Sequence, residues 1–161
     1  MTALDVARRE TERGRRVIPI PHRSKAPVLV AWQTLRLDLD DLPRYFNGEP
    51  SNIGVLLGEP SGHLVDIDLD APEAVALADG FLPTTRSVFG RTSKPRSHRE
   101  YICEISTEKF ADVEKDENDA TAMLVEIRST GSQTMWPSST HPKVELIEWG
   151  EDGEPAHVDR A

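Results

Sequence analysis

The sequence predicts one mixed-sheet α/β or α+β domain. Helical patterns come early in the chain and strand patterns come late, with one expected helix at 73–79 between strands. The 161 residues are 37% hydrophobic and 29% charged, which is typical of a globular domain with a core of its own. The sequence contains no internal repeat and no low-complexity block.

The first third of the chain begins with a helix. Thr2 and Asp5 have the spacing of a capping box and Gly14 matches a C-cap, so a helix is expected between them. The further elements expected here are a strand at 17–20, a short helix at 40–46 and an apolar strand at 52–58.

Strands dominate the rest of the chain. They are expected at 63–70, 86–89, 97–105, 123–127, 133–136 and 144–149. Residues 90–95 have the composition of a hairpin loop, and 110–120 form an acidic connection that is expected to be exposed. The tail after Gly150 is polar and is expected to fray, which gives one domain over 1–150 and a tail over 151–161.

The charge and the cysteine content limit the class of protein. The net charge of −9 is a poor global match to a polyanion, so any contact with nucleic acid or nucleotide must be local. The basic residues of segment 91–99 offer such a place. One cysteine, Cys103, excludes an internal disulfide and a cysteine-based zinc knuckle. With no apolar run long enough for a bilayer and no signal-peptide core, a cytoplasmic protein without a membrane partner is expected.

The strand at 63–70 carries acids among apolar side chains. Because side chains alternate between the two faces of a strand, Asp66 and Asp68 point the same way. Two neighbouring carboxylates repel each other, and a magnesium or manganese ion between them removes that cost. The other interpretation is that these acids only end a strand. Asp70 shares their face, but the sequence Asp-Ala-Pro-Glu favours Asp70 as the N-cap of the next helix.

Three further features could join this acidic strand. Glu126 lies within an apolar strand, on a face that it shares with Leu124 and Arg128, so it faces either a site or solvent. His98 follows the basic loop and is either structural or a site residue. The hydroxyl-rich segment 137–142 is either a phosphate cradle or only a turn.

The order of these motifs resembles the bifunctional DNA primase–polymerase N-terminal domain of the archaeo-eukaryotic primase superfamily, from about Ala7 to Trp149. The family's acid–hydrophobic–acid motif matches Asp66-Ile67-Asp68, its histidine motif matches His98, and its hydrophobic–acid motif matches Val125-Glu126. The other segments that resemble the family are Val17-Ile18-Pro19 with Lys25, Pro27 and Trp32 after it, Asn52 to Val55 running into Gly58, Leu82 to Thr85, and Gly131 with the Pro-Ser-Ser-Thr-His turn. Arg96 departs from the family, which usually has a small residue two positions before the histidine.

The resemblance implies an RNA-recognition-like sheet packed on a second α/β unit, with the site between them. It also implies a DNA primase/polymerase-type nucleotidyltransferase that adds nucleoside triphosphates to a 3′-hydroxyl on a single-stranded DNA template, in the replication of a mobile element, phage or plasmid. Asp66, Asp68 and Glu126 would hold two ions, Mg²⁺ or Mn²⁺. The triphosphate would contact His98, Ser97 and Arg96 or Arg128.

Members of this family commonly continue into a helicase or DNA-binding region, so a helicase domain or a helicase protein is an expected partner. Two alternatives stay open at this stage. One is a primase-like module that binds a partner or nucleotide without catalysis, which the net charge of −9 and Arg96 keep in view. The other is an Asp-x-Asp phosphatase of the haloacid-dehalogenase type, which is less favoured because that motif usually lies near the N-terminus.

Overall fold

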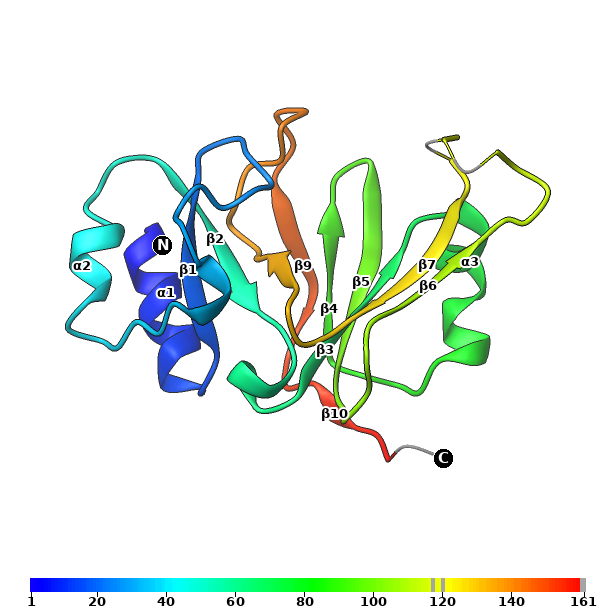
Figure 1. Ribbon diagram of the computed structural model, residues 1–161, viewed down its shortest axis with the longest axis horizontal. Coiled ribbons are helices and arrows are strands. Elements are labelled where there is room, and N and C mark those ends of the chain that lie inside the picture. Colours follow the sequence, from blue (N-terminus) through cyan, green and yellow to red (C-terminus); the bar gives the residue numbers. More distant parts are fainter. Residues whose placement is uncertain (117, 120, 160–161) are drawn as a thin grey trace.

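Two β-sheets that share one core form the frame of the protein (Figure 1). The structure, a computed structural model, describes residues 1–116, 118–119 and 121–159. The helices are α1 (Ala3–Glu12), α2 (Leu42–Tyr45) and α3 (Pro72–Phe81), with short 3₁₀ helices η1 (Trp32–Thr34) and η2 (Glu59–Ser61). The prediction of a mixed α/β domain is confirmed.

The smaller sheet has the order β1-β2-β8 and is antiparallel throughout. Its strands are β1 (Arg16–Pro21), β2 (Ser51–Leu56) and β8 (Gln133–Met135). In Figure 1 α1 and α2 lie on the outer side of this sheet. The capping box predicted for α1 is present, because the Thr2 hydroxyl accepts the Asp5 backbone N–H and the Asp5 carboxylate accepts the Thr2 backbone N–H.

The larger sheet has the order β6-β7-β3-β5-β4-β9, and β10 pairs in parallel with the end of β5. Its strands are β3 (Leu64–Leu69), β4 (Ser87–Arg91), β5 (Lys94–Ile102), β6 (Glu108–Ala111), β7 (Met123–Arg128), β9 (Ile147–Asp152) and β10 (Ala156–His157). β3 is therefore a central strand, antiparallel to β5 on one side and to β7 on the other.

The alternation of β3 divides the protein into two cores. Val65, Ile67 and Leu69 pack beneath α3 in one apolar cluster, whereas Leu64 belongs to the cluster that joins the two sheets and α1. Asp66 and Asp68 lie on the same face as Leu64. The two acids are therefore directed toward the space between the sheets, where the sequence analysis expected the site.

Two predicted elements differ from the structure, and one strand was not predicted. Residues 144–146 are not part of β9, because the backbone N–H groups of His141 and Val144 close a turn there and Val144 has a left-handed φ of 64°. The tail does not fray at Gly150: β9 continues to Asp152, and β10 follows because the Val158 N–H donates to the Ile102 carbonyl. β6 was missed because its four residues are all exposed and show no alternating burial.

The expected acidic connection at 110–120 includes residues 117 and 120, and the expected tail includes 160–161; these four lie outside the described residues. Within the part of the chain that is described, no helix is both long enough and apolar enough to cross a membrane.

Candidate functional site

The register of β3 with its two neighbours builds a polar surface between the sheets. Asp68 is paired with His98 on β5 and with Glu126 on β7, and Asp66 is paired with Arg128 on β7. Directly opposed residues of antiparallel strands share a face, so these five side chains project from one face of the larger sheet. Asp66, Asp68 and Glu126 had been predicted as metal ligands, and His98 and Arg128 as contacts of the triphosphate.

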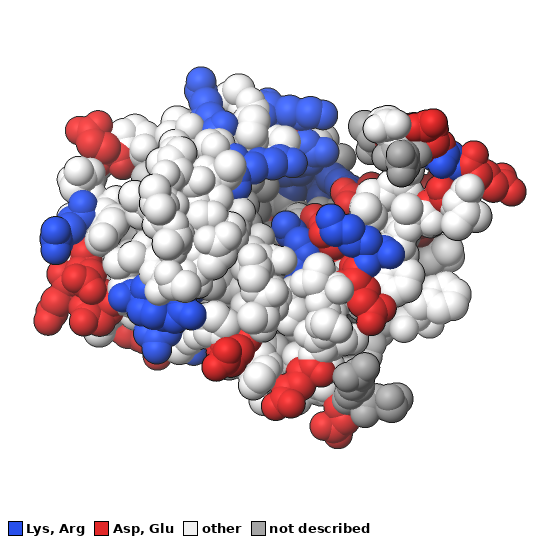
Figure 2. Space-filling model, viewed as in Figure 1, with Lys and Arg blue, Asp and Glu red and all other residues white. Residues whose placement is uncertain are grey.

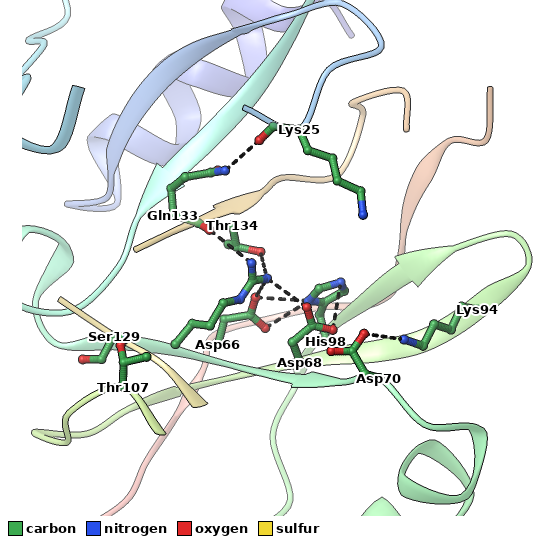
Figure 3. Close-up of polar contacts among 11 residues, drawn as sticks. Lys25, Asp66, Asp68, Asp70, Lys94, His98, Thr107, Ser129, Gln133 and Thr134 are labelled. Carbon is green, nitrogen blue, oxygen red and sulfur yellow. Dashed lines mark hydrogen bonds and ion pairs between the residues drawn. The ribbon is translucent and has the colours of Figure 1, made fainter. Parts of the chain in front are cut away.

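Asp66 and Asp68 are held by two cationic side chains (Figure 3). Arg128 Nη2 lies 2.8 Å from Asp66 Oδ2 and 3.3 Å from Asp68 Oδ2. His98 Nδ1 lies 3.1 Å from Asp66 Oδ2, and its Nε2 lies 3.8 Å from Asp68 Oδ1. The Asp66 side chain has no exposed surface, so its charge depends on these partners.

The position of the Arg128 guanidinium is set by β8 of the other sheet. Its Nη1 donates to the Gln133 carbonyl and its Nη2 to the Thr134 hydroxyl, each over 3.3 Å. Arg128 therefore connects the acidic face of the larger sheet to the smaller sheet. Gln133 and Thr134 were not predicted as site residues, because the sequence shows them only as a pair of polar residues in a short strand.

An aromatic stack sets the orientation of the His98 ring. Phe89 on β4 lies parallel to it, with ring centroids 4.8 Å apart and an interplanar angle of 9°. Phe89 in turn contacts the rings of Trp136 and Trp149. The imidazole is therefore fixed by packing as well as by the two carboxylates.

Burial and charge shift the protonation of this cluster in different directions. Burial alone would raise the pKa of Asp66, but His98 and Arg128 outweigh it and hold that pKa below its usual range. For Asp68 burial dominates and raises the pKa despite the same two cations. Burial would lower the pKa of His98, yet Asp66 and Asp68 together raise it above its usual value. The pair of Asp66 and His98 is thus favoured in its ionic form.

A pocket opens beside this cluster, and Figure 2 shows a hollow bordered by Lys and Arg side chains. Its charged lining consists of Lys25, Asp68, Asp70, Arg91, Lys94, His98 and Arg128. The rest of the lining consists of Ser97, Gln133, Met135, His141 and Ile147. Cations outnumber acids in this lining, so the pocket favours an anionic ligand.

Lys25 reaches the pocket from the loop that follows β1. Its backbone carbonyl accepts a 2.9 Å hydrogen bond from Gln133 Nε2, and the neighbouring Ser24 carbonyl accepts one from Asn52 Nδ2 over 3.0 Å. These bonds attach the loop to the smaller sheet while the Lys25 side chain extends toward the acidic cluster (Figure 3). Burial, together with the charge of Arg91, lowers the pKa of Lys25.

Two predicted site residues have other partners in the structure. Glu126 has only 20% of its side chain exposed, but its carboxylate lies 3.1 Å from Lys109 Nζ rather than between Asp66 and Asp68. Among the described residues, no group of three or more acidic, His or Cys side chains is close enough to hold a metal ion. The role of Glu126 as a metal ligand stays a prediction.

Arg96 does not line the pocket, whereas its neighbour Ser97 does. Arg96 has a left-handed φ of 58° at an irregularity in the pairing of β4 with β5, and its Nη1 lies 2.9 Å from Glu151 Oε1 on β9. The bulge turns this side chain toward β9. Arg96, predicted as a nucleotide contact, is therefore directed away from the pocket.

The assignment of Asp70 as a helix cap is wrong. The N-cap of α3 is Ala71, and no side chain caps this helix. The backbone N–H groups of Asp70 and Ala71 both donate to the Leu124 carbonyl, so contact with β7 continues past the end of β3. This keeps Asp70 on the alternation of the strand, with its carboxylate in the pocket.

Comparison with protein families gives one match over nearly the whole chain. The family model described as bifunctional DNA primase/polymerase, N-terminal, matches residues 7–161. A comparison with curated proteins finds no match.

Proposed function

Because the chain belongs to the bifunctional DNA primase/polymerase N-terminal family, we propose that its pocket binds a nucleoside triphosphate and transfers the nucleotide to a 3′-hydroxyl on a single-stranded DNA template. Membership of this family supports a function of the DNA primase/polymerase type in general. One observation carries the specific proposal: the buried Asp66 and the partly buried Asp68 adjoin a pocket whose charged lining is mainly cationic. Nucleotidyl transfer needs both an acidic metal site and a cationic phosphate site, side by side.

The carboxylates fit a divalent cation by their chemistry. Asp66 and Asp68 supply hard oxygen donors, and Asp66 is buried where a carboxylate needs a permanent counter-charge. Arg128 and His98 now supply that charge. Mg²⁺ or Mn²⁺ bound by Asp66 and Asp68, with Glu126 as a third ligand after it separates from Lys109, would supply activation of the hydroxyl and stabilisation of the leaving pyrophosphate.

The cations around the pocket suit the phosphates of the nucleotide. Lys25, Arg91 and Lys94 line the pocket, and His98 and Arg128 contact the two acids themselves. Charge-assisted hydrogen bonds from such donors stabilise phosphate oxygens more strongly than neutral ones do. Because His98 is fixed by Phe89 and Arg128 by β8, these two donors are preorganised and lose little freedom when the ligand binds.

A non-catalytic nucleotide-binding module is the second candidate. It is favoured by the present pairing of Asp66 and Asp68 with Arg128 and His98, which neutralises both acids without a metal ion. Such a module would bind triphosphate through the same lysines and arginines but would add no nucleotide to a primer.

Primer extension and de novo priming on a single-stranded DNA template distinguish the two candidates. Each is measured with deoxyribonucleotides and with ribonucleotides, in Mg²⁺ and in Mn²⁺. The proposal predicts metal-dependent nucleotide addition that Asp68→Asn abolishes and that Glu151→Gln, which removes a carboxylate outside the pocket, leaves unchanged. Tight nucleotide binding without addition under any of these conditions would favour the non-catalytic module.

A further inference from the structure

An ion pair between Asp70 and Lys94 lies in the lining of the pocket. Lys94 Nζ is 3.2 Å from Asp70 Oδ1, and both residues line the cavity (Figure 3). Lys94 begins β5, directly after the hairpin loop, and Asp70 directly follows β3. The pair therefore connects two elements across the pocket, on the side where β3 ends.

Asp70 has no structural task that explains its position. It caps no helix, and its only side-chain partner among the described residues is Lys94. It lies two residues beyond Asp68 on the same alternation, a distance of about 6.6 Å along an extended chain. Asp66 lies two residues further back along the strand, so the ion pair of Asp70 with Lys94 is a second contact in the pocket, apart from the pairs that Asp66 makes with Arg128 and His98.

The pair is of the kind that a stronger anion can break. The exposed fractions of the two side chains are 37% for Asp70 and 21% for Lys94, and partly exposed ion pairs are weak. A terminal phosphate group competes well for an ammonium group because it carries up to two negative charges and three acceptor oxygens, whereas a carboxylate carries one charge and two oxygens. While Asp70 holds Lys94, however, the free energy of separating the pair is subtracted from the binding of any phosphate that uses Lys94.

We propose that Asp70 is a specificity-determining residue that holds Lys94 until a terminal phosphate of a polyphosphate ligand takes its place. This inference rests on the proposed function only in that a triphosphate enters the pocket. A ligand whose phosphates extend from the acidic cluster to Lys94 displaces Asp70, and a ligand with one phosphate near His98 and Arg128 leaves the pair intact. The contact thus reduces binding of long phosphate chains and leaves binding of short ones unaffected.

The test is a double-mutant cycle on phosphate binding, measured by calorimetry in EDTA with inorganic tripolyphosphate, a nucleoside triphosphate and the matching monophosphate. Asp70→Asn should bind the two triphosphates about two- to tenfold more tightly than the wild type, and the monophosphate equally. Lys94→Met should bind the triphosphates more weakly. In the Lys94→Met background, Asp70→Asn should bring no gain.

Glu151→Gln is the matched control for Asp70→Asn. It also removes one negative charge and releases a basic residue of β5, Arg96, but it lies outside the pocket. It should leave all three affinities unchanged. Melting temperatures show that each variant is folded.

Three results would overturn the inference. If Asp70→Asn raises triphosphate affinity also in the Lys94→Met background, Asp70 only repels phosphate. Weaker or unchanged triphosphate binding by Asp70→Asn means that Asp70 does not compete for Lys94. Absence of triphosphate binding by every variant means that Lys94 is no phosphate ligand. Primer extension separates this inference from the proposed function: extension without the expected gain refutes the inference alone, and the gain without extension refutes the function alone.

Discussion

Replacing Arg128 by Met tests whether this guanidinium holds the place of a metal ion between Asp66 and Asp68. Arg128 makes the shortest ionic contact of Asp66: its Nη2 lies 2.8 Å from Asp66 Oδ2, and 3.3 Å from Asp68 Oδ2. Methionine keeps most of the aliphatic length and removes the charge. In the variant the fully buried Asp66 carboxylate has only His98 as a cationic partner.

The expected cost follows from the burial of Asp66. Removing one partner of a buried ion pair destabilises a protein by roughly 3–5 kcal/mol, and the remaining His98 places this case at the lower end, about 3 kcal/mol. For a domain of this length that corresponds to a melting temperature lower by about 6–12 °C. Arg96→Met is the matched control: its pair with Glu151 is exposed, so the loss should stay below about 1 kcal/mol.

Divalent cations should restore the stability that the Arg128→Met variant loses. With Asp66 and Asp68 released from the guanidinium, Mn²⁺ at about 100 times its dissociation constant contributes about 2.7 kcal/mol to the stability of the folded state. The assay is a thermal melt of wild type and both variants, with and without Mn²⁺. The reasoning is refuted if Arg128→Met melts with the wild type, or if Mn²⁺ shifts its melting temperature no more than that of the wild type.

Three other predictions concern single residues. His98→Ala should weaken triphosphate binding by about tenfold or more, because a charge-assisted hydrogen bond is lost. Its affinity for single-stranded DNA should stay nearly unchanged. A loss of DNA affinity, with a smaller dependence of that affinity on salt concentration, would contradict this. Glu126→Gln should lower nucleotide addition while the melting temperature stays within about 2 °C, because its pair with exposed Lys109 is weak; full activity rules out its ligand role. Burial raises the pKa of Glu100 well above its usual range, so its contribution to stability is present at low pH and is lost as pH rises through that raised pKa. Glu100→Gln should therefore flatten the fall in stability as pH rises above the ordinary pKa range of glutamic acid, measured by urea unfolding at a series of pH values. An equal slope in both proteins refutes the assignment.

The acidic face of β3 was predictable because it depends on one local rule. Alternation along 64–69 is enough to direct Asp66 and Asp68 to one side and Val65 and Ile67 to the other, and the structure shows this division. The strand pattern around His98 and Glu126 likewise identified two strands that are now known to flank β3. The mixed α/β class followed from the same patterns.

Features that depend on pairing between distant strands were not predictable. Asp70 has the local sequence of a helix cap, and only its backbone bond to the Leu124 carbonyl keeps it on the strand alternation. Arg96 lies in a bulge that depends on the register of β4 against β5, so its direction could not be read from its neighbours. The place of Lys25 depends on hydrogen bonds from Gln133 and Asn52, which are remote in sequence.

We propose that Asp66, Asp68 and Glu126 form a divalent metal site beside the triphosphate. The most direct measurement is a crystal structure with Mn²⁺ and a nucleoside triphosphate, in which anomalous scattering locates the manganese. We expect two manganese peaks about 3.5–4 Å apart, in contact with Asp66 and Asp68. Glu126 should have moved away from Lys109, and Arg128 should be released from both aspartates. Manganese bound elsewhere, or nucleotide bound while Asp66 and Asp68 remain paired with Arg128 and His98, would contradict this proposal.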